Sequence, residues 1–342
     1  MEQTIAALGR QVLDDTALDR PRICALLEAG LRRPYDLFYW ANKVRSKHFG
    51  NRVSLCSIIP GRLGGCGEDC KWCAQSVAGT GHLAPPEYAR LSDVQAAAGH
   101  AAACGAGCFC IVNSGRGPSQ GELAAVRDAT AALGREHGGQ AGVAPGSMHI
   151  GASLGELTPQ AAGELFAAGT RRYNHNLETS RRFYSRMVTT HSYDNRLATL
   201  RAAREAGMQL CCGGIFGLGE TWDDRIDLAL TLRDEVKPQM SPLNFLNAIP
   251  GTALEKQPGL QPMEILTIIA MFRMILPTVD LKIAGGRQVN LRDMQSWVFY
   301  VGGTSCLVGN YLTTFGRPVE LDLQMLRDLG LEVVPDVLAA AT

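Results

Sequence analysis

Apolar segments of strand length alternate along most of the chain with longer segments of helical period. The apolar runs are bounded by Gly, Asn and Pro, which is typical of buried strands. From this pattern, strands are expected at residues 52–59, 108–115, 147–155, 171–178, 208–218, 241–247, 280–286 and 305–312. Helices are expected at 93–103, 122–138, 196–207, 223–236, 263–276 and 291–302, and one more begins at Pro159 behind the capping residue Thr158.

Eight strands separated by helices favour an α/β fold with a parallel sheet, and eight strands close a (β/α)8 barrel of the TIM type. An open, doubly wound sheet is the alternative. The 342 residues suffice for one barrel, and no linker or internal repeat divides them. We therefore expect a single domain over residues 1–342, with a core at roughly 46–335 and an N-terminal helical extension over 1–45.

Composition excludes some classes of function. Hydrophobic residues make up 46% and charged residues 19% of the chain, which is ordinary for a globular protein. The 33 basic and 33 acidic residues give a formal net charge of +0, which does not favour binding to nucleic acid or to an anionic membrane. The first residues do not resemble a secretion signal, and no apolar stretch is long enough to span a bilayer. A cytoplasmic protein is expected.

Cysteine is frequent, and its arrangement indicates metal chemistry. Eleven cysteines, an odd number, fit a disulfide framework poorly in a reducing compartment. Cys66, Cys70 and Cys73 follow the first expected strand, at the catalytic face of a barrel. Structural zinc and ferredoxin-type clusters usually take four ligands. Three thiols at this spacing predict a [4Fe-4S] cluster with one iron open to a small molecule, and zinc or ordinary loop thiols are the alternatives.

The cluster loop and four later motifs resemble the radical S-adenosylmethionine (radical SAM) superfamily and, within it, the biotin synthase family. The loop reads CGEDCKWCAQS, and the later motifs are RRYNHNLETSRRFY, CCGGIFGLGETWDDR, PLNFLNAIPGTAL and LKIAGGRQ, in the family's order. The resemblance covers roughly residues 35–335. It implies a full barrel, usually a homodimer, that inserts sulfur into dethiobiotin to give biotin.

The resemblance also implies the cofactors. Side chains cannot break an unactivated C–H bond, so a cofactor must carry that step. In the family that the chain resembles, a reduced [4Fe-4S] cluster binds S-adenosylmethionine (SAM) and cleaves it reductively. A reducing electron-transfer protein is the partner that this chemistry requires.

Polar residues in the motifs are candidates for holding SAM and substrate. Alternation along a strand points Asn174, Asn176 and Glu178 toward one face, into the barrel, and amides suit a ureido ring or a ribose. By resemblance, Asn174 and Asn244 contact dethiobiotin, and Asn176 lies between dethiobiotin and SAM. The SAM site that the resemblance implies comprises Trp72, Asn176, Glu178, Arg196, Gly217 and Glu220, with the Arg196 guanidinium on the SAM carboxylate. The alternatives are a solvated loop end for the asparagines, a solvated helix charge for Arg196 and loop packing for Trp72.

An auxiliary Fe–S cluster is where the chain departs from the family that it resembles. That family holds a [2Fe-2S] cluster, its sulfur source, with three cysteines and one arginine. Cys110 and Cys211 match two of these cysteines, but Gly151 stands near the third position and Lys282 at the arginine. Because an ammonium cannot reproduce a guanidinium fork, an ordinary two-iron site is in doubt.

Two more cysteines are candidates for this auxiliary site. Cys108 shares a strand face with Cys110, and Cys56 lies on the first strand at an inward position. We therefore hypothesise a four-cysteine site of Cys56, Cys108, Cys110 and Cys211 that holds a cluster larger than two irons. Cys212 faces the other way by alternation and is left out. Core packing of Cys56 and Cys108 is the alternative.

Two other functions stay open on the sequence alone. A different radical SAM enzyme on a related barrel, such as a metal-cofactor maturase, would share the cluster loop. A non-catalytic Fe–S or zinc protein would use its thiols for electron transfer or structure, and would neither bind nor cleave SAM. The paired asparagines of YNHNLETS favour biotin synthesis over a different radical SAM reaction.

Overall fold

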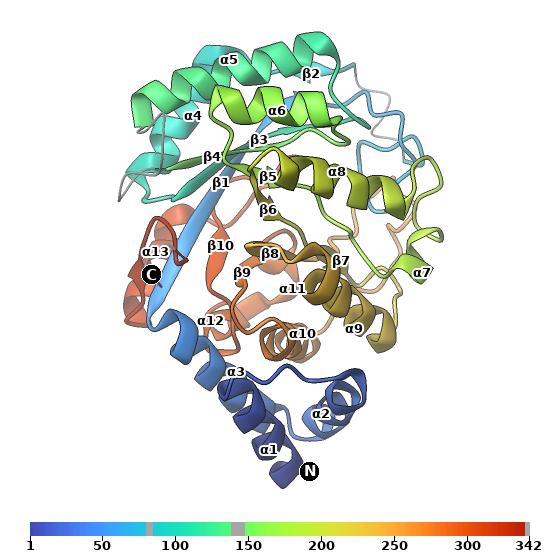
Figure 1. Ribbon diagram of the computed structural model, residues 1–342, viewed down its shortest axis with the longest axis vertical. Helices are drawn as coiled ribbons and strands as arrows, with labels where there is room; N and C mark the ends of the chain where they lie inside the picture. The colour runs from blue at the N-terminus through green and yellow to red at the C-terminus, as the bar shows by residue number, and fades with distance from the viewer. Residues whose placement is uncertain (80–84, 138–147, 339–342) are drawn as a thin grey trace.

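The computed structural model describes residues 1–79, 85–137 and 148–338, and its centre is a closed barrel of parallel strands (Figure 1). Around the barrel these are β1 (Arg52–Leu63), β3 (Cys108–Asn113), β4 (His149–Ser153), β5 (Arg172–Asn174), β6 (Gln209–Cys211), β8 (Met240–Phe245), β9 (Asp280–Ile283) and β10 (Ser305–Leu307). Ser54 of β1 pairs with Ser305 of β10, which closes the sheet on itself. The predicted (β/α)8 barrel is confirmed, and the open doubly wound alternative is wrong.

Three short strands lie outside this ring. β2 (Glu87–Tyr88) pairs antiparallel with the end of β1, β7 (Gly214–Phe216) runs beside β8, and β11 (Glu332–Val333) pairs with the start of β1. The single strand expected over 208–218 is therefore two strands, β6 and β7. They separate at Gly213, where an added Cβ would lie 2.0 Å from the Pro242 carbonyl oxygen, so only glycine allows this approach.

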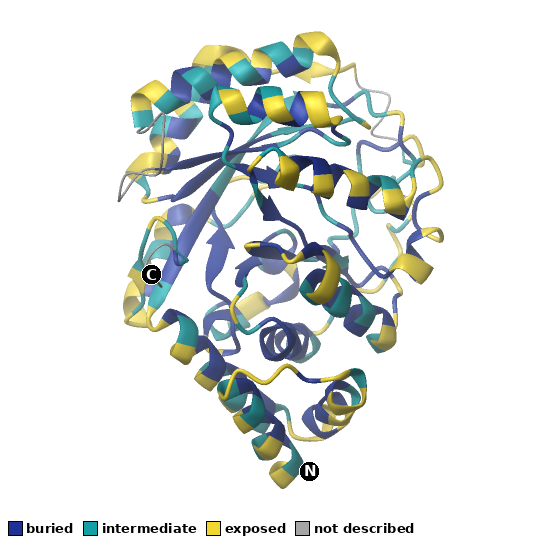
Figure 2. Cartoon of the chain, in the orientation of Figure 1, coloured by how far each residue is buried: buried dark blue, intermediate teal, exposed yellow. Residues whose placement is uncertain are grey.

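Helices cover the outside of the barrel and expose their outer faces (Figure 2). The longer ones are α4 (Leu91–Ala103), α5 (Gln120–His137), α6 (Pro159–Ala168), α8 (Tyr193–Glu205), α9 (Trp222–Thr231), α10 (Pro262–Ile275) and α13 (Val319–Asp328). The shorter ones are α7 (Arg181–Tyr184), η2 (Leu232–Val236), α11 (Arg287–Asn290), η3 (Arg292–Met294) and α12 (Trp297–Tyr300), so the helix expected at 291–302 is broken in two. As predicted, Thr158 caps α6 by accepting from the Ala161 amide.

An N-terminal group of three helices packs on one side of the barrel. α1 (Glu2–Leu13), α2 (Arg20–Arg32) and α3 (Pro34–Phe49) lie together, and α3 and α2 contact α10 (Figure 1). α3 runs past the expected boundary at residue 45 and ends at Gly50, whose φ is 61°. Within the described ranges, no helix combines the length and the apolar composition that crossing a bilayer requires.

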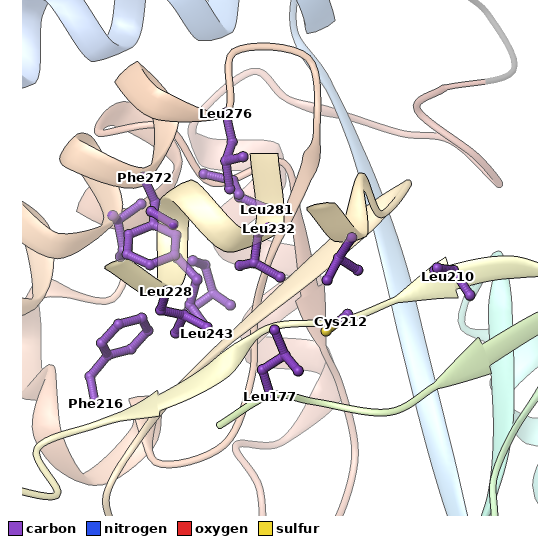
Figure 3. Close-up of a cluster of buried hydrophobic side chains, with 14 of the residues drawn as sticks. Leu177, Leu210, Cys212, Phe216, Leu228, Leu232, Leu243, Phe272, Leu276 and Leu281 are labelled. Carbon is purple, nitrogen blue, oxygen red and sulfur yellow. The ribbon is translucent and has the colours of Figure 1, made fainter. Parts of the chain in front are cut away.

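Side chains of the barrel strands point alternately outward, into the core between strands and helices, and inward, into the barrel lumen. Figure 3 shows the outer core, where Cys212 lies among Leu177, Leu210 and Phe216. The lumen is filled by Cys56, Cys108, Cys211, Met240, Ala284 and Leu307. Cys212 thus faces away from the lumen, as alternation along the strand predicted.

Candidate active site

A cavity of about 320 Å³ opens at the carboxyl-terminal end of the barrel and reaches into the lumen. Trp72 and Cys73, from the loop after β1, and Asn244 of β8 contribute to its walls. Deeper in the barrel it is lined by Cys108, Cys110, Arg172, Cys211 and Lys282. Active sites of (β/α)8 barrels lie at this end of the strands, so this cavity is the candidate active site.

The cluster loop forms part of the rim of this cavity, because Cys73 lines it and Cys66 and Cys70 stand on the same loop. Cys66, Cys70 and Cys73 are unpaired and half-buried, and the Cys73 amide donates to the Cys70 carbonyl at 3.1 Å. Burial raises the pKa of Cys70 and of Cys73, and the neighbouring thiols act in the same direction. A bound cation would therefore stabilise thiolates that this environment otherwise disfavours.

The thiols of this loop were tested for their fit to an iron–sulfur cluster. In the part of the chain that the structure describes, no three His, Cys, Asp or Glu side chains converge closely enough to hold one metal ion. The three loop thiols do act on one another electrostatically. A cubane-type cluster binds each cysteine at a different iron, so its ligands surround a group rather than a point. This donor set fits a [4Fe-4S] cluster.

A second loop holds the cluster loop in place. The Asp69 carboxylate accepts from the amides of Thr189 at 2.9 Å and Thr190 at 3.2 Å, and Glu68 Oε2 lies 2.5 Å from His191 Nδ1. Burial acts to raise the pKa of Asp69, but these hydrogen bonds outweigh it and lower the pKa to about 2. The sequence analysis missed this contact because it joins segments 120 residues apart.

Arg196 of α8 lies beside this second loop and is 8% exposed. Its guanidinium donates to Tyr184 Oη at 2.6 Å and to the Asn176 carbonyl at 2.7 Å, and its Nη2 lies 2.9 Å from His191 Nε2. Its Nη1 also lies 3.8 Å from Glu178 Oε1. The solvated helix charge considered as an alternative is therefore wrong, because this cation is buried and held from several sides.

Glu178 does not share the strand face of Asn174 and Asn176, and that expectation is corrected here. β5 ends at Asn174, and Glu178 has a φ of 70°, so alternation along the strand does not reach it. Burial raises the pKa of the Glu178 carboxyl, against the charge of Arg196. Among the described residues, its Oε2 is buried without a hydrogen-bond partner, which leaves an acceptor for a ligand hydroxyl.

The three predicted asparagines all line the cavity. Both amide atoms of Asn244 are bound to backbone groups, at 3.1 and 2.9 Å, which fixes its orientation. Asn176 Oδ1 accepts from the Gly213 amide at 3.2 Å. Asn174 makes one long contact, from Nδ2 to Ser153 Oγ at 3.4 Å, so most of its hydrogen-bonding capacity is left for a ligand. The solvated loop end considered for Asn174 and Asn176 is wrong, because both line the cavity.

Gly217 and Glu220 are not among the described residues that line the cavity. The Glu220 carboxylate accepts from the amides of Gly217 at 3.0 Å and Leu218 at 2.7 Å, and from Arg225 Nε at 2.8 Å. Gly217 has a φ of 94°, which favours glycine. Glu220 therefore braces the turn after β7, and the structure does not bring these two residues together with Trp72 and the asparagines.

The four cysteines of the hypothesised auxiliary site and Lys282 face one another in the lumen. Cys56 and Cys108 occupy paired positions of β1 and β3, and a hydrogen bond between their thiols raises the pKa of Cys56 and lowers that of Cys108. Lys282 Nζ lies 3.7 Å from Cys56 Sγ and 3.5 Å from Cys211 Sγ. Burial acts to lower the pKa of Lys282, but electrostatic interaction with the four neighbouring cysteines outweighs it and raises the pKa. Cys110 completes this set.

A second buried cation, Arg172, lies in the lumen beside Lys282 and was not among the residues predicted for the site. Arg172 lies on β5 between Gly151 of β4 and Gln209 of β6, and it lines the cavity. A Cβ added to Gly151 would lie 3.2 Å from the Arg172 carbonyl oxygen and 3.5 Å from Cys110 Sγ, so the glycine allows β5 and the Cys110 side chain to approach β4 closely. The signal was present in the sequence, because Arg172 precedes Asn174 by two positions and so shares its strand face.

The chain is similar over most of its length to proteins of known family. The sequence matches the model of the Radical SAM superfamily over residues 62–232 and that of the Biotin and Thiamin Synthesis associated domain over 242–332. The biotin synthase of Trichlorobacter lovleyi is 44% identical, and the alignment covers 98% of each chain. The biotin synthase of Carboxydothermus hydrogenoformans is 42% identical over 97% of this chain and 100% of that one.

Solved structures show the same fold at lower identity. Methylornithine synthase superposes with a TM-score of 0.81 at 19% identity, over 98% of this chain and 100% of that one. The FeFe-hydrogenase maturase HydG from Carboxydothermus hydrogenoformans gives a TM-score of 0.78 at 16% identity, over 97% of this chain and 79% of that one. At these identities the likeness concerns the fold alone.

Proposed function

Because the chain belongs to the biotin synthase family of radical SAM enzymes, we propose that its barrel cavity is where sulfur is inserted into dethiobiotin to give biotin. The family uses SAM and a [4Fe-4S] cluster, and this membership favours biotin synthesis over a maturase or a non-catalytic metal protein. The observation that carries the proposal is that one cavity of about 320 Å³ adjoins the cluster loop, three lumen amides and the buried thiols.

The cluster and SAM are assigned to residues at the rim. Cys66, Cys70 and Cys73 hold the [4Fe-4S] cluster, which when bound supplies the electron that cleaves SAM. Arg196 binds the SAM carboxylate, and its burial beside the cluster loop supports this role. Glu178 accepts from a ribose hydroxyl, which its unpartnered buried oxygen supports.

Four further residues complete the proposed SAM site. Trp72 and Asn176 line the cavity and contact SAM directly. Gly217 and Glu220 act indirectly, by shaping the turn after β7 on the adenine side. This division is supported by the hydrogen bonds of the Glu220 carboxylate to backbone amides and to an arginine.

Dethiobiotin is assigned to the asparagines that point into the lumen. Asn174 has most of its donors and acceptors free and meets the ureido ring, which needs both. Asn244 is held rigidly by two backbone hydrogen bonds and presents a fixed amide to the same ligand. Asn176 lies between the two ligands. A dry, enclosed lumen protects reactive species from water.

The auxiliary cluster is assigned to Cys56, Cys108, Cys110 and Cys211, and it is the sulfur source. All four thiols are buried in the lumen, and the Lys282 ammonium lies beside them. Thiolates are the ligands that iron–sulfur clusters prefer, so Lys282 serves as a nearby charge rather than as an iron ligand. Four thiols around one space can hold a cluster of two or of four irons. We propose the larger one, and the iron count of the auxiliary cluster decides between the two.

The remaining parts of the proposal concern the protein as a whole. The chain is one domain over residues 1–342, which the packing of α2 and α3 against α10 supports. It acts as a homodimer, receives electrons from a reducing electron-transfer protein and is cytoplasmic. The eleven unpaired cysteines suit a reducing compartment.

Anaerobic reconstitution tests the function. The protein is loaded with iron and sulfide, reduced, and mixed with SAM and dethiobiotin. Biotin and 5′-deoxyadenosine are expected together, and neither should form without the reductant. SAM cleavage without any biotin would overturn the substrate assignment, and no SAM cleavage at all would overturn the radical SAM assignment.

A separate experiment tests the auxiliary site. Mössbauer spectra and iron counting are applied to the Cys66→Ala/Cys70→Ala/Cys73→Ala protein, which lacks the ligands of the SAM cluster. A remaining cluster of more than two irons that is lost in Cys56→Ser or Cys108→Ser supports the four-cysteine site. An unchanged cluster in both serine variants would contradict it.

A further inference from the structure

Arg172 is a buried cation deep in the barrel to which no role has been given so far. It is 4% exposed and lines the same cavity as Cys108, Cys211 and Lys282. Long charged side chains are rarely buried without a partner that compensates the charge. The contacts of the guanidinium therefore indicate what it is placed to bind.

The protein holds one side of this guanidinium firmly. Nε and Nη2 donate to Gln209 Oε1 at 3.2 and 2.8 Å, and Nη2 lies 3.5 Å from Asp336 Oδ2. Asp336 follows β11 and also lies 3.1 Å from His149 Nε2, at the start of β4. The segment after β11 thus anchors Arg172 from the amino-terminal end of the barrel.

The other side of the guanidinium is nearly unused. Nη1 carries two N–H groups, and within the described ranges its acceptor is Met240 Sδ at 4.0 Å, a weak one. Burial acts to lower the pKa of Arg172, but electrostatic interaction with Asp336 and with three cysteines of the auxiliary site, Cys108, Cys56 and Cys211, outweighs it and raises the pKa. Nη1 therefore provides strong donors on the side where the sulfur atoms lie.

The charges in the lumen also require an anion. Arg172 and Lys282 are both buried there, and among the described residues Asp336 is the carboxylate within 4.0 Å of either. A buried charge without a counter-charge strongly destabilises the folded protein. A cluster bound by four thiolates is a net anion, and it would compensate both cations.

We propose that Arg172 positions the auxiliary cluster by donating hydrogen bonds from Nη1 to cluster sulfur. Gln209 and Asp336 hold the Arg172 guanidinium in place. The inference rests on the four-cysteine auxiliary site proposed above. Hydrogen bonds and positive charge near a cluster stabilise its reduced form. Arg172 therefore raises the reduction potential of the auxiliary cluster and helps to retain its sulfide.

The test uses the full chain with Cys66→Ala/Cys70→Ala/Cys73→Ala, so that only the auxiliary cluster is observed. Arg172→Met and Arg172→Lys are added to this parent, and iron, sulfide, Mössbauer spectra and the midpoint potential are measured. At the midpoint potential of the parent, Arg172→Met is expected to lower the ratio of reduced to oxidised cluster at least tenfold. Arg172→Lys keeps the positive charge but loses the two-pronged guanidinium group. It should therefore shift the midpoint potential less than Arg172→Met does.

Arg273→Lys is the matched control, because Arg273 is also fully buried but donates to backbone carbonyls of Gly302, Leu276 and Val279. It should lower stability and leave the cluster potential unchanged. Should Arg172→Met fail to fold, Gln209→Leu replaces it, since this change keeps Arg172 and removes its anchor. A smaller shift in the same direction then supports the inference.

The outcomes separate the two proposals. A parent protein without any cluster overturns the auxiliary site and this inference together. A parent with a cluster whose potential and sulfide content are the same in Arg172→Met, or in Gln209→Leu where that variant is used, overturns the inference alone. A potential that moves equally in Arg273→Lys also overturns it, because the effect would then come from general loss of a buried guanidinium.

Discussion

The molecule contains two cysteine-rich regions that are built in opposite ways. At the rim, Cys66, Cys70 and Cys73 stand on one loop and are half-buried. In the lumen, four buried cysteines come from three different strands, β1, β3 and β6. The rim is therefore fixed by local spacing and stays open to a small molecule, whereas the lumen site exists only when the barrel closes.

The two regions also differ in their charges. The rim places Arg196 opposite Glu178, so one cation meets one carboxylate. In the lumen, Lys282 and Arg172 lie near thiols, and Asp336 contacts the side of Arg172 that points away from the thiols. A region with paired charges suits a zwitterionic ligand such as an amino acid, and a region with excess positive charge suits an anionic cluster.

The largest effect is expected in Cys70→Ala, which should remove the function of the rim and leave the lumen site intact. In Cys70→Ala, formation of 5′-deoxyadenosine should fall to the level without protein, because a three-cysteine cluster loses one of its ligands. The auxiliary cluster should keep its Mössbauer signal, since its ligands are on other elements. Deoxyadenosine assays and spectra of the same sample check both statements. Normal SAM cleavage in this variant would remove the rim assignment.

The contrast also explains what the sequence could predict. The fold could be predicted from eight apolar strand segments that alternate with helical segments. The cluster loop could be predicted from the spacing of its three cysteines. Asn174 on β5 and Cys212, directly after the end of β6, were placed correctly because alternation along the strand extends to both. Glu178 was misplaced because β5 ends before it and its φ is positive. The contact of Asp69 with Thr189 could not be predicted, because nothing local links two loops that are far apart in sequence.

The second prediction concerns the lumen. Cys211→Ala should lower the rate of biotin formation to roughly one hundredth of the normal rate or less. This is the size of effect that the loss of a metal ligand, or of a residue supporting one, produces. Cleavage of SAM should continue, because the rim is intact. Separate measurement of biotin and 5′-deoxyadenosine, together with iron content, checks this. Biotin formation at the normal rate would contradict the assignment of Cys211 as a ligand.

The third prediction weakens binding at the rim without removing a cluster. Arg196→Lys keeps the charge but cannot maintain the hydrogen bonds to Tyr184 and the Asn176 carbonyl, nor bind a carboxylate through two N–H groups. A hydrogen bond to a charged group is worth about 1.5 to 3 kcal/mol, so the KM for SAM should rise about 10- to 100-fold. The KM for dethiobiotin should change much less. Equal changes in both would indicate a general distortion of the barrel mouth.

The fourth prediction tests whether Glu220 braces a turn. In Glu220→Gln the carboxylate that accepts from two backbone amides and Arg225 loses its charge and part of its acceptor capacity. Unfolding free energy should fall by about 1 to 3 kcal/mol, which calorimetry or denaturant titration measures. Glu264→Gln is the control, because Glu264 also contacts Arg225 but is more exposed, and it should cost less. A large rise in the KM for SAM without loss of stability would instead favour direct contact with the ligand.

The smallest effect is expected at Cys212, the residue that follows Cys211 in the sequence. Cys212 is buried in the outer core beside Leu177 and Leu210, and its amide donates to the Met240 carbonyl, which a substitution leaves in place (Figure 3). Cys212→Ala removes one sulfur atom from a packed apolar site, so the free energy of unfolding should fall by about 1 kcal/mol. Iron, sulfide and biotin formation should stay at the level of the unmodified protein, because the side chain points away from the lumen. If this variant lost iron as Cys211→Ala does, the division between lumen and outer core at this strand would be wrong.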